Sequence, residues 1–242
     1  MKLVLDIGNT FGKLVVYRQE DEVFRAQFEH KDMYTTLIGL FFDFPGIKQA
    51  ILCSVVVVDS KIRLFLKEKT ILLEVNNEMK LPFENKYETP ETLGADRIGL
   101  VAAAAFKYPG KNCLVVDAGS CVTYDFISSD GIYRGGAISP GLQMRFKAMH
   151  DYTNKLPFVT LNEAFIALGT NTQNSILAGA VNGLVFEIEG WQSSFGSTHK
   201  DLTLILTGGD AQFLSKRLKN TIFAHSNFLV QGLCQLLDYN TL

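Results

Sequence analysis

Two segments of the chain place an aspartate two residues before a glycine, directly after an apolar stretch. The first is Asp6-Ile7-Gly8-Asn9-Thr10, and the second is Asp117-Ala118-Gly119-Ser120-Cys121. In each segment the glycine lets the chain turn tightly, and the backbone N–H groups beside it can line a phosphate. We therefore interpret both as phosphate-directed turns, although ordinary hairpin turns use the same residue types for conformational reasons alone.

Two charged side chains accompany the first turn. Asp6 could hold a magnesium ion directly or through water, because magnesium keeps much of its hydration shell in proteins. Lys13 lies just beyond the turn and could reach a phosphate. The chain contains neither the G-x-x-x-x-G-K-[ST] loop nor the protein-kinase signature set. Any phosphoryl transfer must therefore use different machinery.

A third segment, Gly94-Ala95-Asp96-Arg97, puts a carboxylate beside a guanidinium. The carboxylate of Asp96 can accept a proton, while Arg97 can fix an anionic substrate. Such a pair suits a substrate that carries both a hydroxyl and an acid group. The alternative is a surface ion pair at the start of a helix, which would have no chemical role.

The composition indicates a globular protein without a basic surface for polyanions. Of 242 residues, 47% are hydrophobic and 20% are charged, and the formal charge is −2. We therefore expect no nucleic-acid partner. Four dispersed cysteines without a CxxC spacing favour a reducing cytoplasm, and four dispersed histidines do not suggest a zinc site. We expect neither a secretion signal nor a membrane span, because no apolar run is long enough for either.

The elements that must position these motifs follow a weak internal repeat. Each Asp-x-Gly turn lies between two apolar, strand-like stretches, and residues 50–54 and 202–207 are later strands that each run into a helix-like stretch. The second of these strands leads into Gly208-Gly209-Asp210-Ala211, where two glycines allow a close approach to a flat ligand. We predict an α/β fold with mixed sheets and two domains, 1–111 and 112–242.

Three helix starts are also predicted. A helix should cover residues 92–107, with Pro109-Gly110 as its stop. Another should begin at Ser139-Pro140-Gly141, with serine as the cap and proline in the first turn. Thr172 could cap a third helix before Gln173-Asn174-Ser175.

The paired turns resemble those of the acetate and sugar kinase, heat-shock ATPase and actin superfamily, and the motif series is most similar to type III pantothenate kinases. Beyond the three segments above, Gly135-Gly136-Ala137-Ile138-Ser139-Pro140-Gly141 and Thr207-Gly208-Gly209-Asp210 complete the family's series in order, over nearly the whole chain. The resemblance implies two ribonuclease H-like domains with mixed sheets flanked by helices, and a nucleotide in the cleft between them.

The same resemblance implies roles for individual residues. Asp96 would be the general base, and Asp117 would bind a monovalent cation, potassium or ammonium. The implied pantothenate contacts are Tyr87, Gly94, Ala95, Asp96, Arg97 and Thr172. The implied ATP contacts are Asp6, Ile7, Gly8, Asn9, Thr10, Phe11, Gly12, Lys13 and Ser120. Ser120 and Cys121 are departures, because the family more often has threonine and a small residue there.

The implied reaction is transfer of the γ-phosphoryl group of ATP to the hydroxyl of pantothenate. The product is 4′-phosphopantothenate, in the first step of coenzyme A biosynthesis, and the cofactors are Mg²⁺ and a monovalent cation. The resemblance also implies a cytoplasmic homodimer. Two alternatives stay open: a kinase for another small hydroxy acid, and a non-catalytic nucleotide-binding regulator of the same superfamily.

Overall fold

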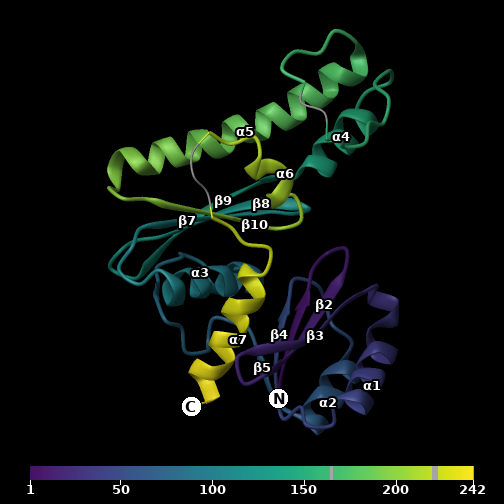
Figure 1. The fold of residues 1–242 in the computed structure, drawn as a ribbon, viewed down its shortest axis with the longest axis vertical. Coiled ribbons are helices and arrows are strands. Elements are labelled where there is room, and N and C mark those ends of the chain that lie inside the picture. Colours follow the sequence, from purple (N-terminus) through teal and green to yellow (C-terminus); the bar gives the residue numbers. More distant parts are fainter. Residues whose placement is uncertain (164–165, 220–222, 242) are drawn as a thin grey trace. The chain divides into compact units, whose positions relative to one another are not determined.

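A computed structural model of the chain describes residues 1–163, 166–219 and 223–241, which fold as two compact units (Figure 1). The first unit comprises Met1–Pro109, Gly131–Tyr133 and Asn227–Leu242, and the second comprises Gly110–Asp130 and Arg134–Ser226. Each has a mixed sheet, flanking helices and its own apolar core, which confirms the predicted mixed α/β class. The predicted ranges 1–111 and 112–242 stay a prediction, and the C-terminal helix packs within the first unit.

The first sheet has the strand order β3-β2-β1-β4-β5. Its strands are β1 (Lys2–Ile7), β2 (Gly12–Arg18), β3 (Asp21–Phe28), β4 (Gln49–Ser54) and β5 (Ile71–Glu74). The first three are antiparallel and joined by short turns. Helices α1 (Met33–Asp43) and α2 (Ser60–Lys69) intervene before β4 and β5, which are therefore parallel to β1.

Side chains on the two faces of this sheet pack against different helices. Leu3, Leu5 and Ile7 point toward α1 and α2, where they join a buried apolar cluster. The other face is covered by α3 (Ala95–Lys107) and α7 (Phe228–Thr241), as Figure 1 shows. These two helices approach closely, because a Cβ on Gly232 would lie 2.5 Å from the Cβ of Ala103. Strand residues 2, 4 and 6 therefore face α3 and α7.

Three short elements complete the first unit. They are the 3₁₀ turns at His30–Asp32 and Pro90–Thr92 and the two-residue strand β6 (Glu84–Asn85). Strand β6 pairs in parallel with the start of β9, with Glu84 opposite Ile132 and Asn85 opposite Tyr133. This pairing fixes the segment that leads to Tyr87.

The second unit repeats the plan of the first. Its strands are β7 (Cys113–Ala118), β8 (Cys121–Ile127), β9 (Ile132–Pro140), β10 (Thr203–Thr207) and β11 (Phe223–Ala224), in the order β11-β10-β7-β8-β9. Strand β7 is antiparallel to β8 and parallel to β10, as β1 is to β2 and β4. The helices are α4 (Leu142–Asp151), α5 (Thr172–Thr198) and α6 (Ala211–Ser215). The repeat seen in the sequence is therefore a repeat of strand topology.

The predicted helix start at Ser139-Pro140-Gly141 is wrong by two residues. Ser139 and Pro140 are the last residues of β9, and α4 begins only at Leu142, with Gly141 as its N-cap. The reason lies in tertiary contacts, because the N–H of Gly141 donates to the carbonyl oxygen of Ser120 at 3.1 Å and keeps the segment extended.

The other two helix predictions are shifted rather than lost. Helix α3 runs from Ala95 to Lys107, so it begins three residues later than predicted: Thr92 ends a separate 3₁₀ turn, and Gly94 is the N-cap. Thr172 is the first residue of α5 and not its cap, since Asn171 accepts the N–H of Asn174 at 2.9 Å.

Candidate active site

The first Asp-x-Gly turn places Asp6 in a row of three side chains that crosses the first sheet. In the strand register, Asp6 of β1 lies opposite Lys13 of β2 on one side and Cys53 of β4 on the other. Residues in register point to the same face of a sheet, with Cβ atoms about 5 Å apart. The row therefore brings a carboxylate, an ammonium and a thiol together at the carboxyl end of β1.

Helix α3 brings a second carboxylate to this row. Asp96 is the second residue of α3, and its Oδ1 accepts the N–H of Arg97 at 2.8 Å. Gly94 makes room for that carboxylate, because a Cβ there would lie 2.5 Å from Oδ1 of Asp96. The Gly-Ala-Asp sequence thus has a steric reason: glycine leaves the space into which the aspartate side chain folds back.

The two carboxylates interact electrostatically. Burial raises the pKa of Asp6 to about 6, Lys13 opposes that rise, and the charge of Asp96 adds to it. Burial also raises the pKa of Asp96, against the opposing effects of the Arg97 N–H and guanidinium. Burial and the charges of both aspartates raise the pKa of Cys53 well above its usual range. A cluster of this kind can exchange a proton or bind a cation.

The first turn is held by contacts that the sequence motif does not contain. The N–H of Gly8 donates to the carbonyl oxygen of Phe11 at 3.1 Å, and Nε2 of His30 donates to the carbonyl oxygen of Gly8 at 2.9 Å. A Cβ on Gly12 would lie 2.3 Å from the ring of Phe28, so a side chain there would displace that ring. Asn9 and Thr10 are exposed, as the phosphate-binding prediction requires.

Two of the predicted substrate residues lie together in the first unit. The guanidinium carbon of Arg97 is 5.4 Å from the centre of the Tyr87 ring. Arg97 is only 4% exposed, and its Nη2 donates to the hydroxyl of Tyr133 at 2.9 Å. Tyr87 is half-buried, and its N–H donates to Oδ1 of Asn85 at 3.0 Å. The pair is thus fixed by β6 and by the start of β9.

The second unit contains a row that corresponds to the first. Asp117 of β7 lies opposite Thr123 of β8 and Thr207 of β10 in the strand register. The hydroxyl of Thr207 donates to the carbonyl oxygen of His225 at 2.7 Å. The buried hydroxyl oxygen of Thr123 has no hydrogen-bond partner among the described residues. An orphaned buried oxygen beside a carboxylate fits a monovalent cation, which takes oxygen ligands.

Backbone segments from two other motifs pack against the second turn. A Cβ on Gly141 would lie 2.1 Å from the carbonyl oxygen of Gly119, and a Cβ on Gly208 would lie 2.4 Å from that of Ala118. Gly208 also has φ of +96°, which side chains rarely adopt. The N–H of Asp210 donates to the carbonyl oxygen of Ala118 at 2.9 Å. Three segments distant in sequence therefore meet at residues 117–120, with Ser120 exposed.

Thr172 lies elsewhere in the second unit, at the start of α5. It lines an open hollow of about 510 Å³ together with Met149, Leu156, Gly169, Thr170, Asn171, Ser175 and Ile176. The glycine before it is required sterically, because a Cβ on Gly169 would lie 2.2 Å from the backbone nitrogen of Ser175. The structure leaves Thr172 exposed, as a ligand contact would need.

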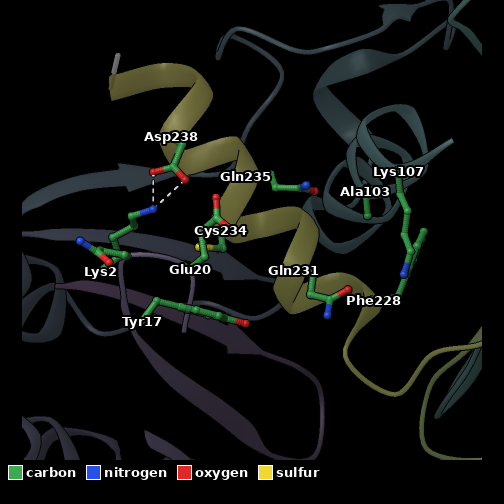
Figure 2. A pocket seen from close by; sticks show the side chains of 11 residues that line it. Lys2, Tyr17, Glu20, Ala103, Lys107, Phe228, Gln231, Cys234, Gln235 and Asp238 are labelled. Atoms are coloured by element: carbon green, nitrogen blue, oxygen red, sulfur yellow. Dashed lines mark hydrogen bonds and ion pairs between the residues drawn. The ribbon is translucent and has the colours of Figure 1, made fainter. Parts of the chain in front are cut away.

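A pocket of about 380 Å³ lies at the other end of the first sheet from Asp6 (Figure 2). Lys2 and Tyr17 lie opposite each other at the start of β1 and the end of β2, on the face that Asp6 shares. Figure 2 shows Lys2 paired with Asp238 of α7, and the Nζ to Oδ1 distance is 2.7 Å. Because Lys2 and Asp6 are separated by about 13 Å along the strand, the pocket is distinct from the carboxylate cluster.

Sequence reasoning missed the residues that complete these sites from other strands. They are His30, Cys53, Thr123 and Tyr133; Thr207 belongs to a motif named in the sequence, but its place beside Asp117 was not predicted. Each belongs to an element that reaches the site through sheet register or tertiary packing, so no local spacing signals it. The internal repeat could have indicated Cys53, since Cys53 and Thr207 stand at corresponding points in the late strand of each half.

Asp6 offers one carboxylate toward a magnesium ion. Among the described residues, no group of three or more His, Cys, Asp or Glu side chains gathers in a way that would hold a metal ion. Magnesium is commonly bound by one or two carboxylates together with substrate phosphates and water. The donor set at Asp6 fits that mode.

Solved structures of low sequence identity share the fold of this chain. A solved structure from Campylobacter jejuni, provisionally described as a Baf family transcriptional activator, shares this fold with a TM-score of 0.65. Its sequence is 22% identical, and the alignment covers 98% of each chain.

The chain belongs to the type III pantothenate kinase family, whose model matches residues 2–193. It is 48% identical over 240 residues to the type III pantothenate kinase of Christiangramia forsetii, with 99% of each chain covered. It is 41% identical over 239 residues to that of Flavobacterium psychrophilum, again over 99% of each chain. Within the described residues, no helix has the length and apolar character that a membrane crossing needs.

Proposed function

We propose that the chain transfers the γ-phosphoryl group of ATP to the hydroxyl of pantothenate and releases 4′-phosphopantothenate, the first step of coenzyme A biosynthesis. Family membership over nearly the whole chain supplies the reaction. The observation that carries the mechanism is that Asp96 is close enough to Asp6, at the carboxyl end of β1, for its charge to raise the pKa of Asp6. A metal-binding carboxylate and a proton acceptor are the two groups that this transfer requires.

Asp96 acts as the general base that accepts the proton of the substrate hydroxyl. Its raised pKa makes it a better proton acceptor than an ordinary aspartate. Its carboxylate is held in place by the N–H of Arg97 and by the space over Gly94. The catalytic gain therefore comes from position as well as from basicity.

The first turn and Ser120 bind the nucleotide. Asp6, Ile7, Gly8, Asn9, Thr10, Phe11, Gly12 and Lys13 supply backbone N–H groups, an ammonium and the carboxylate that holds magnesium, directly or through water. Magnesium neutralises the phosphate charge when it is bound. The row of Lys13, Asp6 and Cys53 supports this assignment, because it places the cationic and anionic groups on one face of the sheet.

Pantothenate is bound by Tyr87, by the segment Gly94, Ala95, Asp96 and Arg97, and by Thr172. The contact between Arg97 and Tyr87 supports this, because a fixed cation beside an aromatic ring suits a carboxylate on an apolar chain. Gly94 and Ala95 offer the backbone at the start of α3, where an anion is favoured.

Asp117 binds the monovalent cation, potassium or ammonium, with Thr123 and Thr207 as neighbouring oxygen donors. The orphaned hydroxyl of Thr123 supports the site. The enzyme further works as a cytoplasmic homodimer without a nucleic-acid partner. The resemblance to its family supports the dimer, and the formal charge of −2 argues against polyanion binding.

A single assay tests the reaction and its rivals. The purified protein is incubated with MgATP and pantothenate in potassium buffer and in sodium buffer, and the product is identified by mass. We expect phosphopantothenate, with more product in potassium. Product from another hydroxy acid only would indicate a different kinase. Nucleotide binding with no product from any acid would favour the regulator.

A further inference from the structure

We propose that Tyr133 is a positioning residue that fixes Arg97 and Tyr87 as one unit for binding the carboxylate of the substrate. This inference rests on the proposed phosphorylation of pantothenate. Tyr133 lies outside every motif described above, and it belongs to the first unit through the segment Gly131–Tyr133. Its side chain is completely buried.

The hydroxyl of Tyr133 fixes the guanidinium of Arg97. It accepts a hydrogen bond from Nη2 at 2.9 Å, and Arg97 is 4% exposed. A hydrogen bond from a charged donor is stronger than a neutral one, and in a buried setting it restricts the rotation of a long side chain. The hydroxyl therefore selects one orientation of a group that has many in water.

The ring and backbone of Tyr133 fix Tyr87. The two rings are stacked, with centres 6.1 Å apart and planes inclined by 18°. Phe83 packs edge-on against the ring of Tyr133 itself, with ring centres 6.0 Å apart. The carbonyl oxygen of Tyr133 also accepts the N–H of Lys86 at 3.0 Å, which holds the residue before Tyr87.

These contacts make Arg97 and Tyr87 a pre-ordered pair. The guanidinium carbon lies 5.4 Å from the centre of the Tyr87 ring, and both groups contact Tyr133. Binding a carboxylate to groups that are already ordered avoids the entropy cost of ordering them on binding. Loss of Tyr133 should therefore weaken pantothenate binding and leave the nucleotide site unaffected.

Tyr133→Phe tests this directly, because it removes the hydroxyl and keeps the ring. We expect the KM for pantothenate to rise about tenfold, which is the loss typical of one hydrogen bond to a charged group. The KM for ATP should stay within about twofold, because the nucleotide contacts lie on the first turn. Thermal unfolding of the variant reports whether the fold is intact.

A matched control uses another completely buried tyrosine hydroxyl. Tyr124 donates to Oε1 of Glu187 at 2.9 Å in the second unit, so Tyr124→Phe removes a comparable bond away from the substrate residues. We expect it to lower the unfolding temperature without raising the KM for pantothenate. The double variant Arg97→Lys, Tyr133→Phe should have a KM for pantothenate close to that of Arg97→Lys alone. Lysine lacks the planar guanidinium whose Nη2 bonds to the Tyr133 hydroxyl, so the second substitution removes nothing more.

The outcomes separate the inference from the function on which it rests. If the wild-type protein makes no phosphopantothenate, the proposed function and the inference both fail. If it makes the product and Tyr133→Phe leaves the KM for pantothenate unchanged, only the inference fails. Equal effects of the two tyrosine variants, or additive effects of Arg97→Lys and Tyr133→Phe, would show that Tyr133 contributes to stability alone.

Discussion

The two units place an aspartate at equivalent points of equivalent sheets, yet surround it differently. In the first unit Asp6 lies in register between a lysine and a cysteine, Lys13 and Cys53. In the second unit Asp117 lies between two threonines, Thr123 and Thr207. A lysine beside a carboxylate suits phosphate and its magnesium, whereas hydroxyl oxygens suit a monovalent cation. The repeated turn therefore does not determine the role of its aspartate; the neighbouring strands do.

The turns also differ in what surrounds their glycines. A Cβ on Gly8 would meet only the carbonyl oxygen of Phe11, at 3.4 Å. The second turn is packed by backbone, since Gly141 and Gly208 approach its carbonyl oxygens so closely that neither could carry a side chain. The first turn thus depends on the side chains of His30 and Phe28, and the second on remote glycines.

The largest expected effect is a loss of turnover from a substitution in the first unit, which supplies the proton acceptor. Asp96→Asn keeps the size of the side chain but removes the proton acceptor, so turnover should fall by about 100-fold or more. The KM for ATP should change little. Steady-state kinetics with both substrates varied will show this. Unchanged turnover would remove Asp96 from the role of base.

Gly208→Ala should disrupt the packing of the second turn, which residue 208 contacts although it lies far away in the sequence. The new Cβ would lie 2.4 Å from both the carbonyl oxygen of Ala118 and Oδ1 of Asp117, in a backbone conformation with φ of +96°. We expect a loss of about 3 kcal/mol in the free energy of unfolding. Gly119→Ala is the matched control, because its Cβ would meet its nearest neighbour at 3.7 Å. If urea unfolding shows equal losses in the free energy of unfolding for both variants, the close packing of Gly208 is not the cause.

Asp6→Asn should stabilise the metal-free protein while lowering turnover. The folded-state pKa of Asp6 is raised from 3.8 to about 6, so the folded protein binds the proton more tightly than the unfolded chain does. Stability from this group is present below pH 3.8 and is lost as the pH rises to about 6. At pH 8 with EDTA, asparagine should therefore raise the free energy of unfolding by up to about 3 kcal/mol. The gain should shrink toward pH 4; a gain independent of pH would rule out the charge as its cause.

The smallest effect concerns the cation beside Asp117. Thr123→Val replaces the orphaned hydroxyl with a methyl group of similar size, so the potassium concentration for half-maximal activity should rise about fivefold. The stabilisation of the wild-type protein by potassium, measured as a shift in unfolding temperature, should weaken in parallel. Choline chloride at equal ionic strength is the control. An unchanged potassium response would exclude Thr123 as a ligand.

The sequence by itself determined the α/β class, the repeated Asp-x-Gly turns and the family, because apolar alternation and glycine spacing are local properties of the chain. It also indicated Asp96 and Arg97, since the pair is contiguous. It misplaced the helix start at Ser139, where local capping preference favoured a helix but a hydrogen bond from Gly141 to Ser120 keeps the chain extended.

Only the tertiary structure decided which side chains meet. Strand register puts Cys53 beside Asp6 and Thr207 beside Asp117, and β9 brings Tyr133 to Arg97 from 36 residues away. Burial, which raises the pKa of both Asp6 and Asp96, likewise depends on α3 covering one face of the first sheet. Such contacts arise from pairing and packing over long sequence separations, and residue spacing alone carries no record of them.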